Sequence, residues 1–179
     1  MSLSDNQTIR IILGRRSVRI FEEKSVETEK VDLLLECAFA APSAMNIRPC
    51  HLVVVDDKEL LKKIGEASVH SRMAAGAPLG LAVCVDVANY EKQHGFTDGT
   101  WMEDASCVME NVLLAARAVG LEGVWLQIAN RPEREGTIPS LLGLPDGVRA
   151  LAMALVGYGA KAKSPHAGVD EARVHHNRW

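Results

Sequence analysis

The sequence contains few aromatic residues, since three Trp, two Tyr and three Phe make up only 4% of its 179 positions. Proteins that bind single-stranded nucleic acids stack bases on aromatic side chains, so this scarcity argues against that class. An excess of basic residues is also missing, because the formal net charge is −3 and the pI is about 6.1. We therefore expect no nucleic-acid partner.

Long apolar runs are absent as well. No stretch approaches the roughly 18–20 apolar residues that a membrane-spanning helix needs. Residues 1–7 lack the basic and apolar regions of a signal peptide. We expect a cytoplasmic protein that does not bind membranes, and its length suits a single domain over residues 1–179.

Motifs for metal binding and for hydrolytic catalysis are missing too. The four cysteines lie far apart and form no C-x-x-C pair, and the histidines show no metal-ligand spacing. The sequence has no H-E-x-x-H, no nucleophile elbow and no Walker loop. We expect no metal site.

Helical and strand patterns alternate along the chain. Short, nearly continuous apolar runs predict four strands, at 52–55, 79–87, 123–129 and 149–156. Periodic apolar positions, caps and prolines predict helices at about 6–13, 25–41, 58–64, 68–75 and 101–119, with another starting near Pro132. A polar, glycine-containing loop is expected at 89–99. The sum is an α+β fold with about four strands in one sheet and helices packed around it.

The long helix at 101–119 is apolar around nearly its whole circumference, and Thr100 and Glu103 form a capping box before it. A helix that is apolar on all sides must be buried on all sides. A homodimer interface would provide that burial. Full burial within one domain is the alternative.

The segment 14–21 carries the strongest chemical signal. Arg15, Arg16, Arg19 and Ser17 place three guanidinium groups and a hydroxyl within five residues. Guanidinium groups donate paired hydrogen bonds to oxyanions, each contributing about 1.5–3 kcal/mol, so the segment is suited to binding a phosphate. A solvated basic turn is the alternative interpretation.

A second signal is the loop 40–49, in which two prolines enclose small residues. Small side chains would let a planar ring approach the backbone, with Ser43 and Asn46 at its edge. An ordinary turn is the alternative. Trp101 is placed to cover such a ring or to pack in the core, and His70 either faces a pocket or lies on the surface.

Taken in order along the chain, these pieces resemble the nitroreductase family of FMN-dependent flavoproteins. The matching stretches are Arg15-Arg16-Ser17-Val18-Arg19-Ile20-Phe21, Ala41-Pro42-Ser43-Ala44-x-Asn46, Gly120-Leu121-x-Gly123-x-Trp125-Leu126, Leu141-Leu142-Gly143-Leu144-Pro145, Gly157-Tyr158 and Val174-His175-His176-Asn177-Arg178-Trp179. Any one of them is weak, but their common order is specific.

The resemblance implies an intertwined homodimer with a central sheet of four to five strands and two FMN sites at the subunit interface. It assigns the phosphate side of FMN to the arginine-serine segment, the ring to a loop of the other subunit, and the reactive edge to a strand. In this order, the residues that it implies are Arg15, Arg16, Ser17 and Arg19; Pro42, Ser43, Ala44 and Asn46; Trp125, Leu126 and Gln127.

The chain departs from the family at two positions. Arg48 stands where the family commonly has glutamine, and Gln127 often replaces a glycine. Arg48 adds positive charge beside the ring loop and Gln127 adds bulk. We expect Arg48, His70 and Trp101 to line the substrate pocket.

The implied activity is an FMN-dependent NAD(P)H oxidoreductase. The flavin carries the chemistry, so no catalytic side chain is required. NADH or NADPH would deliver a hydride and leave before a nitroaromatic, quinone or similar acceptor enters, which is ping-pong turnover. The sequence does not distinguish between the two donors or identify the acceptor. A flavin-binding or redox-sensing module with little turnover is the alternative, suggested by Arg48 and Gln127, and a flavin-free structural dimer is a third interpretation.

Overall fold

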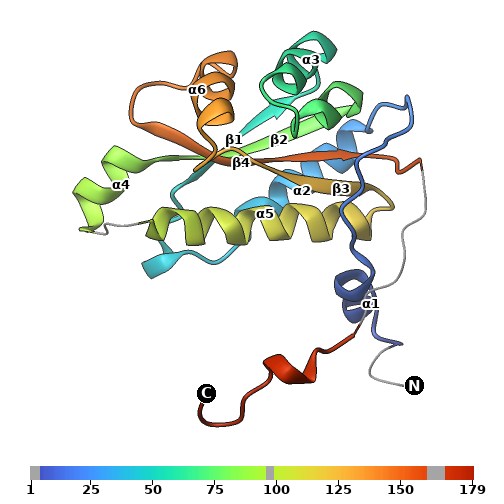
Figure 1. The fold of residues 1–179 in the computed structure, drawn as a ribbon, viewed down its shortest axis with the longest axis vertical. Helices are drawn as coiled ribbons and strands as arrows, with labels where there is room; N and C mark the ends of the chain where they lie inside the picture. The colour runs from blue at the N-terminus through green and yellow to red at the C-terminus, as the bar shows by residue number, and fades with distance from the viewer. Residues whose placement is uncertain (1–4, 96–98, 161–167) are drawn as a thin grey trace.

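In the computed structural model, which describes residues 5–95, 99–160 and 168–179, four strands form one antiparallel sheet with helices on both faces (Figure 1). The strand order is β1-β2-β4-β3. The strands are β1 (Cys50–Val55), β2 (Leu79–Asp86), β3 (Glu122–Gln127) and β4 (Val148–Gly157). The α+β fold and its four predicted strands are confirmed, with strand ends within two residues of the predicted ones.

The helices form a layer on each side of the sheet (Figure 1). One layer is α2 (Thr28–Phe39) with α5 (Thr100–Ala118), and the other is α3 (Lys58–Glu66) with α6 (Pro132–Leu141). The remaining helical elements are α1 (Gln7–Gly14), α4 (Val87–His94), η2 (Ala44–Asn46), η3 (Arg72–Gly76) and η4 (Glu171–Arg173).

The central strand β2 shows why one apolar run serves both layers. Leu81 and Val83 face the cluster under α2 and α5, whereas Ala82 and Cys84 face the cluster under α3 and α6. Successive side chains of a strand point to opposite faces, so a strand covered on both faces must be apolar throughout. The sheet thereby separates two compact cores.

Helix α5 is largely buried within a single chain. Eight of its nine buried residues belong to the core that it shares with the sheet and α2, while Glu110 and Arg117 remain exposed. The alternative of burial inside one domain therefore accounts for most of its apolar surface. The apolar circumference of α5 does not by itself require a second copy.

Three local predictions are wrong. The polar stretch expected to be a loop at 89–99 contains most of α4, because the Asp86 side chain caps the helix by accepting from Asn89 N and Gly95 ends it in a left-handed conformation. The N-cap of α5 is Gly99 rather than Thr100, and Gly99 provides no side-chain cap. The segment expected as a helix at 68–75 shortens to the 3-10 turn η3.

The two ends of the chain extend away from the sheet on the same side as α5 (Figure 1). Helix α1 has no buried residue, and every described residue after Gly168 is exposed. Among the described residues, none of the helices has the length and apolar character needed to cross a membrane.

Candidate functional site

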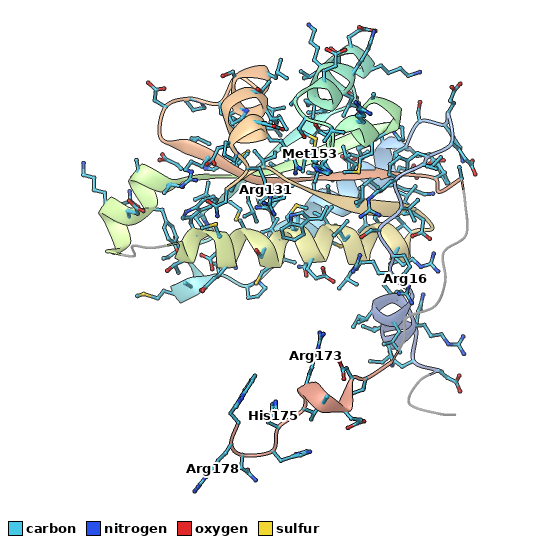
Figure 2. The ribbon with its side chains drawn as sticks, in the orientation of Figure 1. Arg16, Arg131, Met153, Arg173, His175 and Arg178 are labelled. Carbon is cyan, nitrogen blue, oxygen red and sulfur yellow. The ribbon has the colours of Figure 1, made fainter. Side chains whose placement is uncertain are left out.

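The arginine-rich segment begins where α1 ends. Arg15 is the C-cap residue of α1, and its Nε lies 3.7 Å from Glu110 Oε1 on α5. Arg16 Nη1 donates to the carbonyls of Leu13 (2.8 Å) and Arg15 (2.6 Å). Arg16 accordingly lies where α1 meets the carboxyl end of α5 (Figure 2). The local backbone and Glu110 hold the first two guanidinium groups in place.

The rest of this segment is fastened to the outer edge of β3. Ser17 forms a parallel bridge with Gly123, and Val18 N donates to Gly123 O at 3.0 Å. Val18 is buried, whereas Arg19 is exposed and its Nη1 donates to Ser17 O at 3.4 Å. A phosphate ligand could therefore reach Arg19 from solvent.

Gly123 lies where a side chain would be crowded by the neighbouring strand and by α5. A Cβ at position 123 would lie 3.2 Å from the carbonyl oxygen of Leu155 and 3.0 Å from Leu113 Cδ2. The sheet and α5 thus fix the strand position against which Val18 is aligned.

Beyond Gly123, β3 is an edge strand. Gly123 O points outward to Val18, and backbone groups alternate in direction along a strand, so those of Trp125 and Gln127 also point outward. Gln127 O accepts from Arg134 Nη1 at 2.5 Å. This edge offers main-chain hydrogen-bonding groups next to the arginine-rich segment.

The side chains of this strand are well ordered by their neighbours. Trp125 Nε1 donates to Gln127 Oε1 at 2.7 Å, and Gln127 Nε2 donates to Ala129 O at 3.0 Å. Because an indole N–H only donates, the amide of Gln127 must present its oxygen to Trp125. Leu126 is 1% exposed and packs on the opposite face. The side chain of Gln127 therefore lies along the strand, between Trp125 and Ala129.

The loop at 42–48 has an unusual backbone. Met45, Asn46 and Arg48 all have positive φ, at 48°, 58° and 54°. Each such conformation costs a non-glycine residue on the order of 1–2 kcal/mol. The loop is closed by Arg48 N, which donates to Ser43 Oγ (2.9 Å), and by Arg48 Nε, which donates to Asn46 Oδ1 (2.9 Å). Since Arg48 only donates, the Asn46 amide turns its NH₂ group away from Arg48.

Asp104 is a residue of this region that the sequence interpretation missed. It is 5% exposed on α5, and its Oδ1 accepts from Ala44 N at 2.8 Å while its Oδ2 accepts from Tyr90 OH at 3.1 Å. Burial, followed by the charge of Asp104, raises the pKa of Tyr90 to about 12. The sequence signal that could have identified Asp104 is its position one turn before Val108, which puts a carboxyl group on the apolar face of the helix.

Asp104 lies beside a buried thiol, that of Cys50. Burial raises the pKa of the Cys50 thiol to about 12, with the charge of Asp104 as the next contribution. A small cavity of about 20 Å³ lies between the loop and α5. Its wall includes Pro42, Ser43, Arg48 and Asp104. The carboxylate thus reaches the underside of the loop.

Within one chain, the predicted residues fall into separate groups. The arginine-rich segment lies near the carboxyl end of α5, and the loop with η2 lies below its amino end (Figure 1). Strand β3 contacts the arginine-rich segment at Gly123, which pairs with Ser17. The structure therefore does not bring the arginines and the loop together in a single protomer.

Two predicted substrate-pocket residues, Trp101 and His70, lie away from the loop within the single chain. Trp101 is 3% exposed and packs in the core, with Arg149 Cζ 5.0 Å from its ring centroid, so it does not cover an open pocket of the chain. The first turn of α5 lies in the core because the apolar residues that follow on the same helix pack there. His70 is exposed in the turn between α3 and η3, across the sheet from α5. Arg48 alone stays beside the loop.

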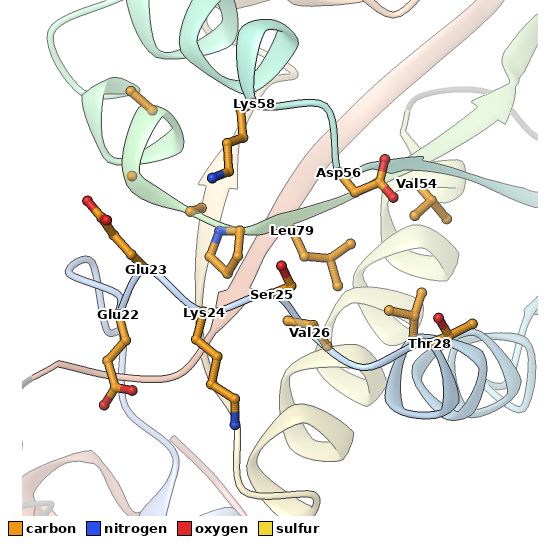
Figure 3. A pocket seen from close by; sticks show the side chains of 15 residues that line it. Glu22, Glu23, Lys24, Ser25, Val26, Thr28, Val54, Asp56, Lys58 and Leu79 are labelled. Atoms are coloured by element: carbon orange, nitrogen blue, oxygen red, sulfur yellow. The ribbon is translucent and has the colours of Figure 1, made fainter.

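A groove of about 480 Å³ lies apart from these groups (Figure 3). It runs between the segment before α2 and the ends of β1 and β2, and it mixes both signs of charge, including Glu23, Lys24, Asp56 and Lys58. None of the predicted cofactor residues is among the described residues that line it. No group of His, Cys, Asp and Glu among the described residues could hold a metal ion.

Comparisons with known proteins agree on one family. The model of the Nitroreductase family matches residues 12–99 and 69–158. The chain is 33% identical over 176 residues to a protein of Archaeoglobus fulgidus named as a candidate NADH dehydrogenase/NAD(P)H nitroreductase, covering 97% of this chain and 99% of the relative.

Solved structures give the same picture. A protein of the same description from Bacteroides thetaiotaomicron superposes with a TM-score of 0.89 at 32% identity, covering 97% of this chain and 99% of that one. An FMN-dependent nitroreductase from Clostridium difficile R20291 superposes with a TM-score of 0.87 at 28% identity, covering 96% and 99%.

Proposed function

The chain belongs to the Nitroreductase family of oxidoreductases, and from that premise we propose that it is an FMN-dependent NAD(P)H oxidoreductase. Its acceptors are proposed to be nitroaromatics, quinones or similar small electrophiles. The main supporting observation is the alignment of the arginine-rich segment with the outer edge of β3, since Val18 N donates to Gly123 O at 3.0 Å.

The groups present suit FMN. Exposed Arg19 offers charged donors to a phosphate, and the outward backbone groups of Trp125 and Gln127 follow on the same strand edge. The loop offers the small residues Ser43 and Ala44 to a flat ring. Charged donors, strand backbone and a flat-ring surface match the three chemical parts of a flavin mononucleotide.

The residue roles follow from this match. Arg15, Arg16, Ser17 and Arg19 would hold the phosphate and ribityl side, with Glu110 setting the position of Arg15. Trp125, Leu126 and Gln127 would supply backbone near the reactive edge. Pro42, Ser43, Ala44 and Asn46 of a partner subunit would cover the ring. When bound, FMN would supply hydride transfer from NADH or NADPH to the acceptor in ping-pong turnover.

The separation of the two residue groups supports a homodimer as part of the proposal. Ile12 and Leu13 on α1 are 48% and 57% exposed, and Trp179 at the chain end is fully exposed. Arg173, His175 and Arg178 stand away from the sheet and its helices (Figure 2). A second copy would cover these ends and bring a loop to each arginine-rich segment.

Flavin titration followed by turnover tests the proposal. Protein stripped of flavin should bind FMN and show a flavin spectrum that NAD(P)H bleaches. Menadione or a nitrofuran should then sustain NADPH or NADH oxidation. Protein that binds no FMN would overturn the proposal, whereas binding without turnover would favour the flavin-sensing alternative, which Arg48 and Gln127 suggest.

A further inference from the structure

The ring loop adopts a backbone that its own residues disfavour. Three of its non-glycine residues have positive φ, and Met45 among them is 82% exposed. Hydrogen bonds inside the loop, such as Arg48 N to Ser43 Oγ, close it but do not fix its place on the protein. Ala41 and Ile47 pack on the core at its two ends, and a hydrogen bond from a rigid element adds a polar attachment between them.

Asp104 supplies this bond from the buried side of α5. Its Oδ1 accepts from Ala44 N at 2.8 Å, so the carboxylate is attached to the main chain of the loop rather than to a mobile side chain. Its Oδ2 accepts from Tyr90 OH at 3.1 Å. Both oxygens of the carboxylate therefore have partners, which fixes its rotation.

Burying a carboxylate at this position costs free energy unless hydrogen bonds offset the loss of hydration. Asp104 is 5% exposed among apolar residues of α5, where an apolar side chain would pack without loss of hydration. Helix α4 contributes Tyr90, itself 4% exposed, as the second donor. Two helices are thus joined to one loop through a single carboxylate.

We propose that Asp104 is a positioning residue that holds the flavin-covering loop at a fixed distance from α5. Tyr90 fixes the orientation of the Asp104 carboxylate. This inference rests on the proposed function, because it assigns the loop to the flavin. Asp104 acts through Ala44 N and sets where Ser43 and Asn46 meet the ring. It makes no contact with the reacting atoms.

Three substitutions separate this role from general stability. Asp104→Ala removes the acceptor, and Asp104→Asn keeps it, since the amide oxygen accepts from Ala44 N and the NH₂ group donates to the Tyr90 oxygen. Ala44→Pro removes the N–H and places the proline Cδ on the side that faces Asp104 Oδ1. Proline is compatible there because Ala44 begins η2 and Ser43 before it is extended, at φ −143° and ψ 156°.

The measurement is the FMN dissociation constant of flavin-stripped protein, taken beside its melting temperature and the visible spectrum of the bound flavin. Asp104→Ala and Ala44→Pro are each expected to weaken FMN binding about tenfold or more and to shift the flavin spectrum. Asp104→Asn is expected to stay within about threefold of the unmodified protein. The Tyr90→Phe variant should fall between these groups.

The double variant Asp104→Ala/Ala44→Pro gives the sharpest comparison. Because both changes remove one bond, the double variant should bind FMN about as weakly as either single variant. A loss of melting temperature with unchanged FMN affinity in both single variants would overturn the inference. If Asp104→Ala does not fold, Ala44→Pro alone decides, and unchanged affinity again overturns it. Failure of the unmodified protein to bind FMN would instead remove the proposed function.

Discussion

The hydroxyl of Tyr158 donates to the Glu27 carboxylate at 2.6–2.7 Å, which joins the end of β4 to the residue before α2. Lys30 Nζ donates to the same hydroxyl at 2.7 Å, and Lys24 Nζ lies 3.7 Å from the ring centroid. Glu22 N also donates to the main-chain oxygen of Tyr158 at 2.9 Å. The segment that follows the arginines is therefore attached to the sheet at its far end as well.

This cluster predicts a measurable pH dependence. The hydrogen bond from Tyr158 is the main reason that the pKa of Glu27 falls from 4.5 to about 2. The folded state thus favours the carboxylate, and its stabilisation is complete above pH 4.5 and lost as the pH falls toward 2. Glu27→Gln should lower the melting temperature slightly at neutral pH, because the pair is exposed. The difference should shrink between these pH values, and a constant difference down to pH 3 would contradict the assignment.

Arg19 offers a direct test of the phosphate assignment. Its guanidinium is exposed and contacts its own segment through Ser17 O. Arg19→Ala should weaken FMN binding by about 1.5–3 kcal/mol, roughly ten- to a hundredfold, in a fluorescence titration. Arg72→Ala, an exposed arginine of η3, is the control and should bind FMN normally. Equal affinity in the two variants would show that Arg19 does not contact the phosphate.

The elements of the sheet could be predicted because each strand is a local signal. The central strand β2 is apolar at nearly every position, and Pro132 begins α6 where proline is tolerated. Helix α4 escaped prediction because its sequence is mostly polar and only its Asp86 cap and Gly95 end define it. Its hydrogen bond from Tyr90 to Asp104 joins residues that no periodic pattern relates.

The candidate site was predicted in part for a similar reason. The guanidinium groups and the small-residue loop are visible as sequence motifs, but their separation along α5 depends on the fold. Trp101 and His70 flank predicted loops, which is why the sequence predicts them at the pocket. Within the single chain, Trp101 lies in the first turn of α5 and packs in the core beneath the sheet, and His70 follows α3 on the other face.

Gly123 should be intolerant of any side chain. Gly123→Ala would push a Cβ toward the Leu155 carbonyl oxygen, 3.2 Å away, within a strand that cannot move freely. We expect a loss of about 1–3 kcal/mol in the free energy of unfolding, measured with urea. Gly136→Ala is the control in α6, where no atom lies within 4 Å of the new Cβ. It should stabilise the protein by about 0.5–1 kcal/mol, and the same sign for both variants would refute the packing argument.

The oligomeric state can be tested at α1. This helix has eight residues, none buried, and isolated helices shorter than about 12–15 residues are marginal in water. Its apolar Leu13, 57% exposed, therefore needs a surface to pack on, and a second protomer would provide one. Light scattering should give twice the 19.4 kDa of one chain. Leu13→Glu should shift the protein toward monomer and weaken FMN binding in parallel. Val69→Glu, 59% exposed on the turn before η3, should change neither, so a dimeric Leu13→Glu variant with full FMN affinity would contradict a site shared between protomers.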